Sequence, residues 1–78
     1  MNYVFYGWNG RDRDRLDIIS RKSKGDALRV AAYWLASNDP VSYRGEAQLK
    51  KYWASGYEVT MCEWRAHGKE WELIEGKC

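Results

Sequence analysis

The side chains best suited to covalent chemistry are one histidine, His67, and two cysteines, Cys62 and Cys78. A cysteine nucleophile needs a base such as histidine within hydrogen-bond reach to take its proton. His67 falls in a predicted turn, and Cys62 lies five residues earlier on the extended strand that leads into it, which holds the two side chains too far apart for such a pair. We therefore identify no catalytic residue and predict that the chain is not an enzyme.

Metal and cofactor sites are not indicated either. The cysteines and the histidine do not have the spacing of a compact zinc site. Three aspartates alternate with arginines, but a calcium loop needs Asp, Asn and Gly at set intervals and a closing Glu. The glycines form no phosphate-binding fingerprint. We expect no metal and no cofactor, and we interpret the alternating segment as a solvated hairpin tip made of Arg11, Asp12, Arg13, Asp14 and Arg15.

The expected location is cytoplasmic. Residues 1–8 lack the basic segment and apolar stretch of a signal peptide, and no apolar run approaches the length of a membrane span. The cytosol keeps thiols reduced, so we expect Cys62 and Cys78 to be free.

The elements that must position these residues follow from local patterns. β-Branched and aromatic residues predict a strand over 2–8 and a second over 16–20, joined after Asn9-Gly10 by the charged tip. Ser23 resembles a helix N-cap, and apolar spacing predicts a helix over 23–36 that ends before Asp39-Pro40. Its expected inner face consists of Ala27, Val30, Ala31 and Trp34.

A second helix is predicted over residues 45–55, because Leu49 and Trp53 are one turn apart and Gly56 follows as a stop. Strands are predicted over 57–65 and 69–75. A two-residue turn at His67-Gly68 would pair Arg65 with Glu70 and Trp64 with Trp71, and we prefer it to a three-residue loop that sets Arg65 opposite Lys69.

These elements predict an α+β fold. The chain, residues 1–78, is one domain with a four-stranded antiparallel sheet and both helices on one face, in the order strand, strand, helix, helix, strand, strand. If helices cover one face, the other meets water. Yet both faces of the last two strands carry apolar groups: Tyr57, Val59, Met61 and Ile74 on one, and Cys62, Trp64, Trp71 and Leu73 on the other.

This surplus of apolar surface indicates a binding partner. The chain has five Trp, six Tyr and one Phe, more aromatic residues than one small core needs. Trp and Tyr anchor protein interfaces, so we predict a protein-binding inhibitor or adaptor. The candidate partner-binding residues are Arg11, Arg13, Arg15, Tyr57, Met61, Trp64, Trp71 and Ile74.

Two alternatives stay open. Sheet aromatics with the basic run Arg21-Lys22-Ser23-Lys24 would suit a nucleic acid, although a net charge of +2 is low for that role. A homodimer would also consume an apolar face.

The chain resembles the small accessory proteins of tailed bacteriophages, including those that inhibit host defence systems. The resemblance lies in its size, its aromatic start at Tyr3-Val4-Phe5-Tyr6-Gly7-Trp8 and its strand–helix–strand layout. It implies a protein that occupies the surface of a host protein. Some members mimic the charge of nucleic acid, and this chain departs from them because it is slightly basic.

Overall fold

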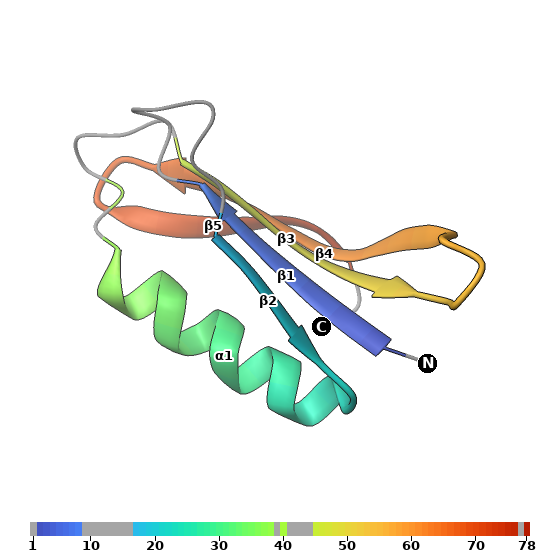
Figure 1. Cartoon of the computed structure of the whole chain (residues 1–78). Coiled ribbons are helices and arrows are strands. Elements are labelled where there is room, and N and C mark those ends of the chain that lie inside the picture. The colour runs from blue at the N-terminus through green and yellow to red at the C-terminus, as the bar shows by residue number, and fades with distance from the viewer. Residues whose placement is uncertain (1, 9–16, 39, 41–44, 77) are drawn as a thin grey trace.

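Five antiparallel strands and one helix make up the part of the chain that the structure describes, which is residues 2–8, 17–38, 40, 45–76 and 78 of a computed structural model (Figure 1). The elements are β1 (Asn2–Trp8), β2 (Asp17–Arg21), α1 (Lys24–Ser37), β3 (Glu46–Tyr52), β4 (Glu58–His67) and β5 (Glu70–Gly76). In space the strands follow the order β2-β1-β3-β4-β5, and each neighbouring pair is antiparallel. The predicted α+β class with a single antiparallel sheet is confirmed, but the described residues form five strands instead of four and one helix instead of two.

Helix α1 begins and ends at side chains that satisfy its free backbone groups. The Oγ atom of Ser23 accepts a hydrogen bond of 3.1 Å from the backbone N–H of Asp26. At the other end, Nδ2 of Asn38 donates to the carbonyl oxygen of Trp34 at 2.8 Å. The predicted cap at Ser23 is confirmed, as is most of the predicted inner face, whose buried members are Ala27, Ala31 and Trp34.

The predicted second helix over residues 45–55 is wrong, because β3 occupies most of this range at the centre of the sheet. Leu49 of β3 lies opposite Phe5 of β1 on one side and Cys62 of β4 on the other. Along β3, the buried residues Ala47 and Leu49 alternate with half-buried polar ones, which is the period of a strand. Pairing on both edges of β3 outweighs the high helix propensity of its Glu, Ala, Gln, Leu and Lys residues.

Both predicted registers of the last hairpin are wrong. The turn consists of Gly68 and Lys69, so that His67 faces Glu70, Arg65 faces Glu72 and Trp64 faces Leu73. Gly68 has a φ of 58°, which suits the first position of the type II′ turn that a two-residue hairpin favours. Relative to the preferred register the partner of each residue moves by two positions, so the predicted sharing of one face by Trp64, Trp71 and Leu73 is retained.

The core lies between α1 and the middle of the sheet. The largest fully buried side chains are Phe5, Leu49 and Cys62, which form one row across β1, β3 and β4. Trp34 packs over this row from the helix, with its ring centroid 5.5 Å from that of Phe5. Gly7 makes room for Trp34, since a Cβ atom there would lie 2.6 Å from the Cζ2 atom of the indole.

The expectation of two free thiols is also wrong, because Cys62 and Cys78 form a disulfide. Their Cα atoms are 5.9 Å apart, a separation that suits such a bond. The bond ties the C-terminal residue to the buried side of β4, next to the site where Gly76 pairs with Cys62. The closed loop contains the whole of β5.

Candidate functional site

Helix α1 covers only one part of the sheet. Figure 1 shows α1 beneath β1 and β2, and its contacts are mainly with these strands and with β3. Strands β4 and β5 lie at the far side of the sheet from β2. Among the described elements, α1 contacts chiefly β1, β2 and β3, so it covers β4 and β5 less than the other strands.

Two of the predicted binding residues, Trp64 and Trp71, extend the core where the helix stops. Both are partly buried against it. The indole of Trp71 lies 5.4 Å from that of Trp34, and its Nε1 donates to the backbone carbonyl oxygen of Asn38 at 2.8 Å. Trp64 makes an edge contact with Phe5 at a centroid distance of 6.2 Å. These two tryptophans therefore serve the packing of the chain itself.

Apart from Tyr33 on α1, the large apolar side chains that stay exposed form two separate groups. On β5, Leu73 is 48% exposed and Ile74 is 42% exposed. At the β3–β4 turn, Tyr57 is 64% exposed and Val59 is 39% exposed, and the Tyr57 ring lies 5.3 Å from that of Trp53. The predicted residues Tyr57 and Ile74 thus belong to different surfaces.

Of the other predicted residues, Met61 is partly buried against the core, at an irregularity of the β3–β4 pairing. The predicted residues Arg11, Arg13 and Arg15 lie outside the described residues. Sequence reasoning did not select Leu73 as a site residue. The signal for Leu73 is its position on β5, the last strand in the described order, opposite Trp64. That pairing could be predicted only with the correct turn, Gly68-Lys69.

The helix-free face of the sheet is acidic where the start of β3, the end of β4 and the start of β5 lie side by side. Cross-strand pairing sets Glu46 opposite Arg65 and Arg65 opposite Glu72, and directly opposed residues share a face. We call this the acidic face, and it consists of Glu46, Glu63, Arg65, Glu70 and Glu72. A guanidinium nitrogen of Arg65 lies 3.8 Å from Glu63 Oε1, so the one arginine is outnumbered by carboxylates.

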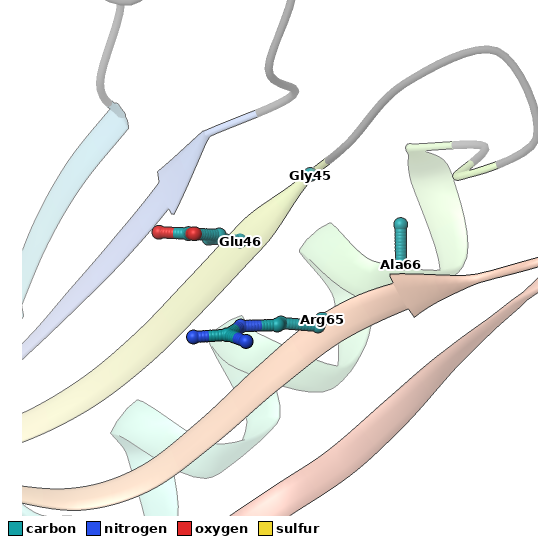
Figure 2. Close-up of a pocket in the computed structure, with 4 residues that line it drawn as sticks. All are labelled: Gly45, Glu46, Arg65 and Ala66. Atoms are coloured by element: carbon teal, nitrogen blue, oxygen red, sulfur yellow. The ribbon is translucent and has the colours of Figure 1, made fainter.

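A hollow of 460 Å³ marks the end of this face, and its described lining is Gly45, Glu46, Arg65 and Ala66 (Figure 2). Figure 2 shows the side chains of Glu46 and Arg65 extending from neighbouring strands toward the same side. Ala66 donates its backbone N–H to the carbonyl oxygen of Gly45 at 3.0 Å, which closes the strand pair there. The hollow offers one cation and one carboxylate, so it has no strong preference for ligand charge.

The opposite end of the molecule is basic, with Arg21, Lys22 and Lys24 at the β2–α1 junction and Lys51 on β3. Tyr3 lies opposite both Arg21 and Lys51, so these two basic residues are its neighbours on the adjacent strands. The ammonium nitrogen of Lys51 lies 5.5 Å from the centroid of the Trp53 ring. The net charge of the chain is low because the acidic face and the basic end cancel in the sum, although they lie on different surfaces.

Tyr6 links the central strands on the helix-free face. Its hydroxyl donates to Glu58 Oε1 at 3.0 Å, and the Lys50 ammonium lies 3.6 Å from the other carboxylate oxygen. Burial raises the pKa of Tyr6 above 10.0, and the hydrogen bond to the Glu58 carboxylate raises it further. The protonated phenol is thus held as a structural donor at neutral pH.

The residues considered first for chemistry do not come together. The His67 side chain is 80% exposed and pairs with Glu72, its Nδ1 atom lying 3.4 Å from Oε2. Cys62 is buried in its disulfide, so it has no free thiolate. Within the described ranges, no group of three or more His, Cys, Asp or Glu side chains is placed to hold a metal ion. No helix in that part of the chain combines the length and the apolar character needed to cross a bilayer.

Comparison with known proteins adds no relative. No family model matches the chain, and no curated protein and no solved structure resembles it to a significant degree.

Proposed function

We propose that the chain is a protein-binding module, an inhibitor or adaptor, that contacts a larger protein through the β5 side of its sheet. The observation that carries the proposal is the exposure of Leu73 and Ile74 on β5, which pairs with one strand, β4, in the described sheet. Apolar side chains beside unpaired backbone groups form a surface that gains free energy when a partner covers it. The acidic face beside them would supply the charged rim that such interfaces have.

The decisive experiment compares partner capture by matched surface variants. The change is Leu73→Lys with Ile74→Lys, and the control is Tyr33→Lys on α1, whose side chain is 76% exposed. Affinity purification from host cells with quantitative mass spectrometry should yield one stoichiometric protein with the wild type and the Tyr33 control. The β5 variant should lose it. Retention of that protein by the β5 variant would refute this surface as the interface.

The phage resemblance extends this proposal to the blocking of a host defence protein. Its support is the size and the aromatic β1 segment, Tyr3 to Trp8. If it holds, expression of the chain should raise phage plating on a host with an active defence system. The β5 variant should not raise it, and the Tyr33 control should.

A nucleic-acid-binding function is the second candidate, and the basic end is what favours it. Lys51 and Arg21 lie beside Tyr3, and the Trp53–Tyr57 pair supplies rings on which bases can stack. Binding to single-stranded DNA should then weaken steeply with salt, and Lys51→Ala should reduce the steepness. A flat salt dependence would exclude this candidate.

A cytoplasmic location is part of the primary proposal, and the disulfide gives it a direct test. Alkylation of intact cells before lysis records the redox state of Cys62 and Cys78. Two alkylated thiols would support the cytoplasm, because its reductants keep cysteines unpaired. A fully oxidised pair would place the chain in an oxidising compartment.

A further inference from the structure

The outer side of β5 has backbone groups that no described strand pairs, because β5 is the last strand of the sheet. The two-residue turn fixes which groups these are. In such a hairpin, the residues that flank the turn exchange both backbone hydrogen bonds, and the next pair exchanges none. His67 and Glu70 flank the turn, so Glu70 and Glu72 direct their N–H and C=O groups toward β4. Trp71 and Leu73 direct theirs outward.

The side chains of β5 present different chemistry on the two faces of the sheet. Leu73 lies opposite Trp64 on the face that carries α1, next to the half-buried Trp71. Glu70 and Glu72 are exposed and lie on the acidic face. A strand added to this edge would place alternate side chains beside these two sets, because successive side chains of a strand point to opposite faces.

The charges beside β5 indicate which kind of partner segment would bind this edge. The acidic face holds Glu46, Glu63, Glu70 and Glu72 beside Arg65 and beside His67, which pairs with Glu72. Carboxylates outnumber cations, so a cationic side chain gains attraction there. A second copy of this chain would bring its own Glu70 and Glu72 to the same edge, and like charges across a strand pair are unfavourable. The other sheet edge, β2, differs because α1 packs against it and the basic end begins there.

We propose that β5 is a docking edge for an extended segment of a partner protein in which Lys or Arg alternates with aliphatic residues. The segment adds to the sheet as a sixth strand. Its backbone pairs with Trp71 and Leu73, its aliphatic side chains cover Leu73, and its cations face Glu70 and Glu72. This inference rests on the proposed protein-binding function and specifies its partner and its geometry.

The test uses the full chain and a synthetic peptide of about nine residues in which Lys and Val alternate, a length that suits one strand. Calorimetry should show binding at low salt, and hydrogen exchange should show new protection of the backbone amides of Trp71 and Leu73. A peptide with Glu in place of Lys should not bind. Protection confined to the Trp53–Tyr57 turn, or equal binding of the Glu peptide, would overturn the proposal.

Variants separate backbone pairing from side-chain contact. Leu73→Pro removes one outward N–H and no bond to β4, and Pro is tolerated at such edge positions. Relative to Leu73→Thr, it should weaken peptide binding about five- to tenfold, the effect of one lost hydrogen bond. The matched control is Leu73→Thr, which loses the same aliphatic contact but keeps the backbone N–H. If a peptide strand pairs with this N–H, the Leu73→Pro variant must bind the peptide more weakly than the Leu73→Thr variant. Equal binding by the two would overturn strand addition.

Charge reversal covers the case in which Leu73→Pro does not fold. Glu70→Lys with Glu72→Lys should abolish binding of the Lys peptide and permit binding of the Glu peptide. If the partner is lost by the Leu73→Lys and Ile74→Lys variant but kept by both Leu73→Pro and the charge reversal, protein binding stands and strand addition fails. A dimer in light scattering that Leu73→Pro dissolves would identify a second copy as the occupant and overturn the choice of a basic partner.

Discussion

Substitution of Gly7 by alanine tests the packing of α1 against the sheet. A Cβ atom at Gly7 would lie 2.6 Å from Cζ2 and 2.8 Å from Cδ2 of Trp34, well inside van der Waals contact. The indole cannot retreat freely, because Trp34 is 7% exposed and lies between Phe5 and Trp71. Overpacking of this kind costs about 1–3 kcal/mol.

A smaller gain opposes this cost, since replacing glycine removes about 0.4–1 kcal/mol of unfolded-state entropy. The net loss of unfolding free energy for Gly7→Ala is therefore about 1–2 kcal/mol. At about 4–8 °C per kcal/mol for a domain of this size, the melting temperature should fall by about 5–15 °C. Urea unfolding followed by tryptophan fluorescence measures the free energy directly.

The matched control is Gly25→Ala in the first turn of α1. There the nearest atom to an added Cβ is the Ser23 Oγ at 3.7 Å, an ordinary contact. Alanine at Gly25 should therefore stabilise by about 0.5–1 kcal/mol. In a Trp34→Leu background the penalty of Gly7→Ala should shrink, because the clashing ring is gone. A Gly7→Ala protein as stable as the wild type would refute the close approach of α1 to β1.

Three further predictions concern the disulfide, the central tyrosine and the helix cap. Cys78→Ser should lower the unfolding free energy by about 3 kcal/mol, because the closed loop holds β5, and a reductant should lower the wild type equally; a wild type indifferent to reductant would contradict this. The raised pKa of Tyr6 favours its protonated form in the folded state, so stability present below pH 10.0 should decline as pH rises through the folded-state pKa. Phenolate absorbance should show Tyr6 ionising at lower pH in Glu58→Gln, and an unchanged titration would argue against the hydrogen bond. Ser23→Ala should cost about 1 kcal/mol in urea unfolding, and no loss would mean that the cap is not formed in solution.

The sequence predicted the elements whose patterns are local. The strand over 2–8, the helix after Ser23 and the last hairpin depend on cues within a few residues, and each is confirmed at nearly the predicted bounds. The predicted helix over 45–55 failed because its cues were ambiguous. A left-handed glycine suits a helix end and a tight turn equally, and Gly56, with a φ of 87°, belongs to the β3–β4 turn.

The candidate site was harder to predict because it depends on long-range contacts. The prediction identified a surplus of aromatic residues but could not know that Trp71 would hydrogen-bond to Asn38. Nor could composition reveal that the charges separate into an acidic face and a basic end, since that requires the strand order. Because the turn was predicted at His67-Gly68, the pairing of Leu73 with Trp64 was not predicted. Because residues 45–55 were predicted as a helix, the strand β3 was missed.

The strand order also constrains how the chain folds. Strands β3, β4 and β5 form a meander of consecutive hairpins, and β1 forms a hairpin with β2, so both units depend on nearby contacts. Among the described strand pairs, only that of β1 with β3 joins segments far apart in the sequence. Because closing a long loop slows folding, we expect the β1–β3 pairing to form last and to limit the folding rate. The edge at β5 would then exist in the meander before the core is complete.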